Sequence, residues 1–360
     1  MPSPLVKKLL EKAVSTNASD VYTVVGHTPS LRINGEIIKL DSDFKALSDK
    51  DVLEFIKSLM STEQFKVYQE QKELDFAYSL NQARFRVNAF HQMGNPSCCL
   101  RYLESNIPSL ESLNLSPIFK ELAERSSGII LFSGPTGCGK STTMSAMIDH
   151  INSNFAKHII TIEDPVEYLH PIKKSIVEQR EIGRDSKSFG KAMKSALRQN
   201  PNVLLMGEMR DLESISSAIT LAETGHLVFS TIHSRSSVQT INKIIDSFPG
   251  DQQSQIRQQL SESLLAVISQ RLVPRQDKKG LALAIEIMIV NNAIANLIRE
   301  EKTHQIESTI QTSRREGMQL IDDDLLRLVQ EESISAQDAI NWSSHPKGFK
   351  DKLKGLGLLD

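Results

Sequence analysis

The chain has 360 residues, of which 39% are hydrophobic and 24% are charged, and its formal net charge is −2. This length suffices for roughly two domains with separate hydrophobic cores. The slightly negative charge and the 5% aromatic content argue against a nucleic-acid partner. No apolar run approaches the ~20 residues of a membrane span and no signal peptide is evident, so we expect a cytoplasmic protein with no membrane span.

The N-terminal part is predicted to mix short helices with antiparallel strands. Apolar residues at helical spacing predict a helix over Pro4–Thr16, and a strand follows at Val21–Val25. The dipeptide Asn34-Gly35 supplies the positive-φ positions of a two-residue hairpin turn. Ser48 can cap the helix that follows it, and another helix is predicted over Thr62–Gln71.

Further strands are predicted over residues 74–78, 83–90 and 98–103. In the middle strand Arg84 and Arg86 alternate with apolar residues, so the two arginines share one face of the sheet. A solvated sheet face explains this pattern. The alternative is that Arg84, Arg86 or Arg101 reaches phosphate oxygens, which a planar guanidinium binds well.

A linker between two domains is predicted at residues 105–116. This stretch contains Pro108 and several serines, and it lacks sustained periodicity. Residues 1–104 mix helices with antiparallel strands, whereas strands alternate with helices in residues 117–360. We therefore expect an N-terminal α+β domain followed by a C-terminal parallel α/β domain.

The second domain contains a phosphate-binding P-loop. The segment Ser133–Thr143 matches the pattern G-x-x-x-x-G-K-[ST] at every specified position, between a short apolar strand and a predicted helix. Backbone N–H groups at such a helix N-terminus bind phosphate, Lys140 reaches the β- and γ-phosphates, and Ser141 ligates Mg²⁺. The predicted nucleotide-binding residues are Gly134, Pro135, Thr136, Gly137, Cys138, Gly139, Lys140, Ser141 and Thr142.

Acidic residues follow two other predicted strands. A strand at 158–162 runs into Glu163–Tyr168, and one at 203–206 runs into Gly207 and Glu208. Because open α/β sheets bind ligands at the carboxyl ends of their strands, these acids can serve a triphosphate and Mg²⁺. Many P-loop enzymes have Asp where this chain has Gly207, so Glu208 must act alone on metal or water there. Solvated loop acids are the alternative for the first segment.

A further predicted strand is bracketed by His226 and His233. Their seven-residue spacing along a strand excludes a simple shared metal site, and a histidine at a strand end is often structural. His233 is the stronger functional candidate, because its strand end can contact a γ-phosphate.

Helices are predicted for most of the remaining chain. Apolar periodicity predicts one over Ser236–Ser247 and then a long helix, capped by Asp251, that includes Leu264, Val267 and Ile268. After Ala293 we expect charged amphipathic helices whose charges are mostly solvated.

Together these motifs closely resemble those of the type II/IV secretion ATPases, specifically the PilT-like branch. In that family the P-loop is the Walker A motif and Glu163–Tyr168 is the Asp box. The segments Gly207–Asp211 and Glu223–His233 correspond to the Walker B motif and the His box. Residues 83–90 and 293–300 also resemble PilT segments, the latter with one altered position.

The resemblance implies a PAS-like N-terminal domain and a RecA-like ATPase domain with C-terminal helices, assembled as a homohexamer. It implies Mg²⁺-dependent ATP hydrolysis that powers pilus retraction and twitching motility from the cytoplasmic face of the inner membrane. The implied partners are an inner-membrane pilus platform protein and possibly a paralogous retraction ATPase.

The resemblance also implies roles for individual residues. Glu167 is implied as the catalytic acid of the Asp box, Glu208 as the Walker B acid, and His226 with His233 as the His-box pair. Candidate arginines that approach the nucleotide from the N-terminal domain across an interface are Arg84, Arg86 and Arg101.

Two departures bear on the choice within the family. The chain has neither the four-cysteine zinc insert nor the extra N-terminal domain of extension and secretion ATPases, which favours the retraction branch. The altered C-terminal motif leaves open an auxiliary PilU-like paralogue. A nucleotide-dependent scaffold for another secretion ATPase is the alternative from a different functional class.

Overall fold

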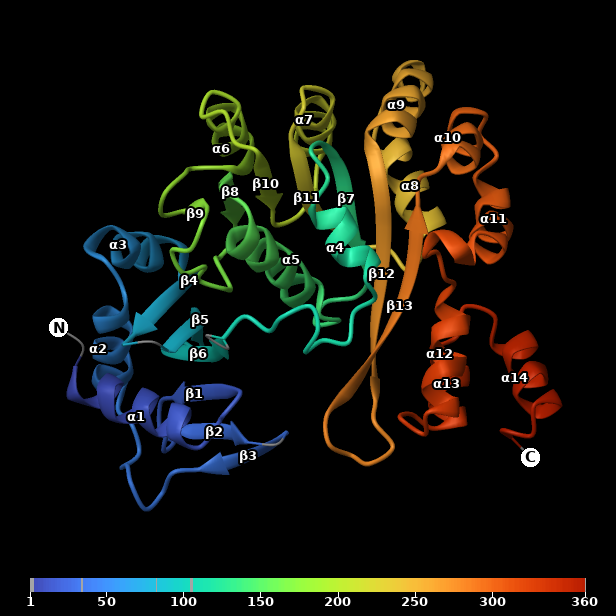
Figure 1. The fold of residues 1–360 in the computed structure, drawn as a ribbon. Helices are drawn as coiled ribbons and strands as arrows, with labels where there is room; N and C mark the ends of the chain where they lie inside the picture. Colours follow the sequence, from blue (N-terminus) through green and yellow to red (C-terminus); the bar gives the residue numbers. More distant parts are fainter. Residues whose placement is uncertain (1–2, 34, 82, 104–105, 360) are drawn as a thin grey trace. The chain divides into compact units, whose positions relative to one another are not determined.

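The computed structural model describes residues 3–33, 35–81, 83–103 and 106–359 (Figure 1). The chain forms two compact units. The N-terminal unit runs to Ile107 and also includes Asp164–Leu169, whereas the C-terminal unit comprises Pro108–Glu163 and the chain from His170 onward. The acidic segment after the strand at 158–163 therefore groups with the N-terminal unit.

The N-terminal unit is an antiparallel sheet with strand order β3-β2-β1-β6-β5-β4, accompanied by helices. The strands are β1 (Asp20–Val24), β2 (Ser30–Ile33), β3 (Glu36–Lys39), β4 (Glu73–Leu80), β5 (Ala83–Gln92) and β6 (Asn95–Leu103). The helices are α1 (Pro4–Ser15), α2 (Asp49–Leu59) and α3 (Thr62–Gln71). Phe85, Val87 and Ala89 of β5 are fully buried in the core, as their alternation predicts.

The predicted local signals of this unit are largely confirmed. Ser48 caps α2 in a capping box with Asp51, whose side chain accepts the Ser48 backbone N–H. Strands β2 and β3 pair as a hairpin with Gly35 at φ +87°, while Asn34 of the predicted turn lies outside the described residues. Residue 104, the last of the predicted N-terminal domain, and residue 105, the first of the predicted linker, also lie outside them.

The C-terminal unit contains a mixed sheet with strand order β13-β12-β7-β11-β10-β8-β9. Its strands are β7 (Gly128–Ser133), β8 (His158–Glu163), β9 (Ile176–Glu181), β10 (Val203–Met206), β11 (Leu227–Ile232), β12 (Leu264–Pro274) and β13 (Leu281–Ile289). Neighbouring strands are parallel except β12 and β13, which are antiparallel.

Helices cover both faces of this sheet. They are α4 (Ile118–Ala123), α5 (Lys140–Asn154), α6 (Phe189–Ala196), α7 (Leu212–Glu223), α8 (Ser237–Asp246), α9 (Gly250–Ser263), α10 (Asn292–Arg299), α11 (Ile306–Thr312), α12 (Ile321–Gln330), α13 (Ala336–Trp342) and α14 (Pro346–Gly355). One face packs on α4 and α5, the other on α6 to α11, and α12 to α14 share a separate apolar cluster with the ends of β12 and β13. The predicted parallel α/β core with helical C-terminal region is confirmed.

The predicted long helix after Pro249 is wrong in its second half. Helix α9 ends at Ser263, and Leu264, Val267 and Ile268 belong to β12. Because β12 is a central strand covered on both faces, its apolar run shows no alternation and is hard to distinguish from a buried helix. Asp251 is also not the N-cap: it lies in the first turn of α9, and Pro249 holds the cap position.

Residues 281–290 are an apolar run that Glu286 interrupts, and most of this run forms strand β13. Among the described residues, no helix is both long and apolar enough to cross a membrane.

Candidate active site

Parallel pairing brings four strand ends to one edge of the C-terminal sheet. Ser133 at the end of β7 pairs with Ile232 of β11, and Met206 of β10 pairs with Ile162 of β8. Because β10 also pairs with β11, these carboxyl ends form a continuous row in the order β7, β11, β10 and β8. This edge therefore carries the P-loop, His233, Glu208 and Glu163, which lie at or just after the four strand ends.

The P-loop bends tightly between β7 and α5. Gly134, Gly137 and Gly139 have φ angles of +136°, +78° and +90°, where a side chain is strained. The Lys140 ammonium is buried and donates to the carbonyl oxygens of Gly134 (2.9 Å) and Pro135 (2.8 Å). The P-loop therefore holds the Lys140 ammonium against carbonyl oxygens of the loop backbone, next to the end of β7.

Helix α5 begins at Lys140 directly after the loop, so its first backbone N–H groups belong to Lys140, Ser141 and Thr142. The N-cap position is Gly139, which has no side-chain acceptor for these donors. Such N–H groups, with the positive end of the helix dipole, suit phosphate. Burial raises the pKa of the Cys138 thiol, so this loop residue stays protonated at neutral pH.

Glu208 and His233 meet at the centre of the row. His233 Nε2 lies 3.3 Å from Glu208 Oε1, and Arg210 Nε donates to Glu208 Oε2 over 2.7 Å. The Thr231 hydroxyl donates to the Gly207 carbonyl over 2.6 Å, which fixes the turn that presents Glu208. A partly exposed carboxylate held between two basic side chains can orient water or bind a cation.

Glu163 is a site candidate that the sequence reasoning did not single out. It ends β8, and its Oε1 accepts the hydroxyl of Thr161 over 2.7 Å. The Gly207 N–H donates to the carbonyl of Ile162, so Glu163 and Glu208 leave neighbouring strands side by side. Its position directly after a predicted buried strand was the available signal.

The structure does not bring His226 and His233 together. His226 lies at the amino end of β11, where its Nδ1 is 2.9 Å from the Leu221 carbonyl and 3.2 Å from the Thr224 hydroxyl. At ~3.3 Å per residue, the seven-residue step places it roughly 23 Å from His233 along the strand. His226 therefore joins the end of α7 to β11, and only His233 lies at the P-loop edge.

Glu167 and the candidate arginines belong to the N-terminal unit. Arg84 is buried, and its Nε donates to the Val166 carbonyl over 2.8 Å, so it holds the acidic segment that contains Glu167. The sequence pattern was compatible with a solvated sheet face at Arg84, but the structure shows that this arginine is buried. Arg101 is exposed and pairs with Asp20 (3.1 Å), and Arg86 lies opposite Arg101 in the antiparallel register.

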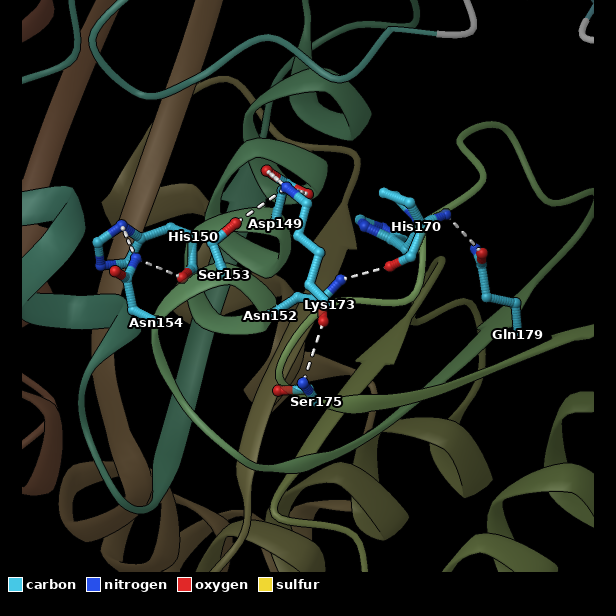
Figure 2. Close-up of polar contacts among 10 residues, drawn as sticks. Asp149, His150, Asn152, Ser153, Asn154, His170, Lys173, Ser175 and Gln179 are labelled. Carbon is cyan, nitrogen blue, oxygen red and sulfur yellow. Dashed lines mark hydrogen bonds and ion pairs between the residues drawn. The ribbon is translucent and has the colours of Figure 1, made fainter.

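The chain that follows the acidic segment is fastened to α5 (Figure 2). The buried Asn152 donates to the Pro171 carbonyl over 2.8 Å and accepts the Ser175 N–H over 3.3 Å, while Lys173 donates to both carboxylate oxygens of Asp149, each over 2.7 Å. This loop is therefore tied to the C-terminal half of the helix that starts at the P-loop.

The described residues contain no cluster of three or more His, Cys, Asp or Glu side chains that could hold a metal by themselves. A hydroxyl and carboxylates at the end of a P-loop are nevertheless the hard oxygen donors that Mg²⁺ uses together with substrate phosphates and water. Ser141 and Glu208 fit that incomplete protein donor set.

The family described as type II/IV secretion system protein matches residues 2–347. The chain belongs to this family, and the resemblance identified from its motifs is confirmed.

Individual relatives indicate its branch. The chain is 43% identical to a twitching motility protein of Neisseria gonorrhoeae, over 93% of this chain and 89% of the relative. It is 41% identical to the type IV pilus retraction ATPase PilT of Pseudomonas aeruginosa, over 96% and 99% of the two chains. Its identity to the type IV pilus ATPase PilU of the same species is 39%, over 93% and 87%.

Two solved structures share the fold of this chain, and one of them is a pilus retraction motor. The crystal structure of the pilus retraction motor PilT with bound ADP superposes with a TM-score of 0.89 at 41% identity, covering 96% of this chain and 98% of that one. The Legionella pneumophila ATPase DotB gives a TM-score of 0.81 at 26% identity, covering 98% and 95%. The predicted fold class, an N-terminal domain with a RecA-like ATPase domain, is thereby confirmed.

Proposed function

We propose that this chain is an ATPase that powers the retraction of type IV pili. The observation that carries the proposal is the row of Lys140, Glu208 and His233 at one sheet edge, in a chain that is 41% identical to a pilus retraction ATPase over 96% of its length. The reaction is hydrolysis of ATP to ADP and phosphate, coupled to disassembly of pilin from the pilus.

The residues of the row divide the chemistry among them. Backbone N–H groups from Gly134 to Thr142 surround the phosphates, and the Lys140 ammonium transfers from its loop carbonyls to the β- and γ-phosphate oxygens. Glu208 orients the attacking water and accepts its proton, and His233, 3.3 Å away, contacts the γ-phosphate. Glu163 is an additional acid at the same edge.

Mg²⁺ is the cation that the donor set fits. Ser141 and Glu208 would hold it, and it would supply charge neutralisation at the phosphate oxygens.

The N-terminal unit supplies further groups in this proposal. Glu167 acts as the catalytic acid of the Asp box, whereas His226, which belongs to the C-terminal unit, supports the strand that leads to His233. Among the arginines, Arg86 and Arg101 approach the nucleotide, whereas Arg84 holds the Glu167 segment through the Val166 carbonyl. An arginine delivered to a transferring phosphoryl group raises rates by about 10³ to 10⁵ in known cases.

The assembly proposed is a homohexamer at the cytoplasmic face of the inner membrane. It acts on an inner-membrane pilus platform protein, and a paralogous retraction ATPase is a further partner. The support is the likeness to PilT and PilU, which are pilus ATPases of one species.

The test combines enzymology with cells. Purified protein should hydrolyse ATP only with Mg²⁺, and turnover should fall at least about 10³-fold in Lys140→Ala and Glu208→Gln but not in the exposed-surface control Glu262→Gln. Cells that lack the protein, or carry Lys140→Ala, should accumulate pili that do not shorten. Normal pilus numbers with intact turnover would instead indicate an auxiliary paralogue, and absent turnover in a nucleotide-binding hexamer would indicate a scaffold.

A further inference from the structure

A cavity of about 900 Å³ lies in the C-terminal unit beside the start of the P-loop. Its walls include Gly134 and Pro135, the loop 233–236 between β11 and α8, and the segment 341–345 that leaves α13. The loop that carries His233 and a segment more than one hundred residues later in the chain therefore face the same space.

Arg271 of β12 joins these two walls. Its guanidinium donates to the Trp342 carbonyl, to the Ser344 hydroxyl (3.1 Å) and to the Arg235 carbonyl (3.2 Å). The first two acceptors belong to the segment 342–345, which we call the C-terminal strap, and the third belongs to the His233 loop. The planar side chain of Arg271 therefore holds the backbone of the C-terminal strap and the backbone of the His233 loop.

The His233 loop is otherwise held by its own surroundings. Lys243 Nζ donates to the His233 carbonyl (2.8 Å), and the Ser237 N–H donates to the buried carboxylate of Glu286 (2.7 Å). Burial raises the pKa of Glu286, which stands on β13 and balances part of the charge of Arg271. These contacts keep the loop near the sheet, but they do not reach the strap.

The strap is held at its other side by α12. Asp322 accepts the Ser343 hydroxyl (2.9 Å) and the Ser344 N–H (2.8 Å). A continuous series of contacts thus runs from Glu208 through His233 and its loop to Arg271, and from there through the strap to α12.

We propose that Arg271 is a positioning residue that couples the His233 loop to the C-terminal strap, so that the state of the nucleotide site and the arrangement of the C-terminal helices depend on each other. The guanidinium suits this task because its rigid fork of N–H donors serves acceptors in different directions, which a lysine ammonium on a flexible stem does not reproduce. The inference rests on the proposed ATPase function.

Arg271→Lys tests the coupling, with Arg275→Gln as the matched control. Arg275 follows the same strand and pairs only locally, with Asp277 in an exposed turn. We expect kcat for ATP to fall about tenfold or more in Arg271→Lys, equivalent to about 1.4 kcal/mol in the barrier, with KM changed less than about threefold. The control should match wild type in both constants.

A second readout does not depend on turnover. Trp342 is the one tryptophan of the chain, so its emission reports on the strap. We expect ADP and a non-hydrolysable ATP analogue to give different Trp342 emission in the wild type and in Arg275→Gln, and the same emission in Arg271→Lys. Ser344→Ala, at an exposed position, should reduce kcat in the same direction by a smaller factor.

Three results would overturn the inference: unchanged kcat in folded Arg271→Lys, a rise in KM alone, or a nucleotide-dependent Trp342 signal that survives the substitution. If Arg271→Lys does not fold, Ser344→Ala with unchanged kcat and unchanged Trp342 response overturns it instead. If the wild type lacks turnover, the proposed function fails, while the fluorescence comparison still decides whether nucleotide and strap are coupled.

Discussion

Two glycines of the P-loop, Gly134 and Gly137, allow a matched test of how closely the loop packs against β12. A Cβ at Gly134 would lie 2.4 Å from the carbonyl oxygen of Gln270 and 2.6 Å from Cys138 Sγ, whereas a Cβ at Gly137 would meet nothing within 4 Å. Both residues have positive φ, +136° and +78°. Because Gln270 pairs with Ile285 of β13 and directly follows the last residue of β12 that pairs with β7, its carbonyl has little freedom to retreat.

Gly137→Ala should lower the free energy of unfolding of the C-terminal unit by about 1–2 kcal/mol, the cost of a Cβ in left-handed backbone. Gly134→Ala adds an overpacking cost of about 1–3 kcal/mol, for a total of about 2–5 kcal/mol. Since Lys140 Nζ is bound to the Gly134 carbonyl over 2.9 Å, displacement of Gly134 should also weaken nucleotide binding more than Gly137→Ala does.

Urea denaturation followed by Trp342 emission measures the first effect, and titration with a fluorescent ADP analogue measures the second. Equal losses of stability in the two variants would refute the reasoning, because they would mean that the contact of Gly134 with β12 has no energetic consequence. A Gly134→Ala protein of wild-type affinity would refute the link to Lys140.

Thr231→Val keeps the side-chain volume but removes the donor to the Gly207 carbonyl (2.6 Å), and we expect a loss of about 1–3 kcal/mol in urea denaturation. Asn152→Ala removes the side chain that donates to the Pro171 carbonyl and accepts the Ser175 N–H, and it should cost about 2–4 kcal/mol by the same measurement. Burial lowers the pKa of His170 to about 4, so the unfolded state binds the proton more readily. Stability should therefore fall as pH drops from about 6.5 to 4, by up to about 3 kcal/mol, and His170→Gln should flatten this dependence; equal slopes would contradict it.

The nucleotide-binding edge was largely predictable from local sequence. The P-loop pattern is contiguous, and the strands that lead to Glu163, Glu208 and His233 are short apolar runs between polar stretches. Parallel strands with helical connections align their carboxyl ends, so the sequence alone predicts that motifs far apart in the chain lie at one edge of the sheet.

The sequence-based predictions were wrong where one sequence pattern is compatible with two different structures. An apolar run such as Leu264–Ile268 is compatible with a buried strand or a buried helix, and only its pairing with β7 and β13 decides. His226 and His233 belong to one motif, yet an extended strand carries them to opposite edges of the sheet. Arg84 alternates like a surface residue but is buried and donates to the Val166 carbonyl.

The sequence by itself determined the family of the chain, the position of its P-loop and the acids that follow its buried strands, because these depend on neighbouring residues and on local periodicity. Tertiary structure alone decided that Glu163 lies beside Glu208, that the acidic segment after it groups with the N-terminal unit, and that Arg271 joins the His233 loop to the C-terminal strap. Each of these depends on contacts between residues far apart in the chain, and no local pattern encodes which distant carbonyl a side chain will reach.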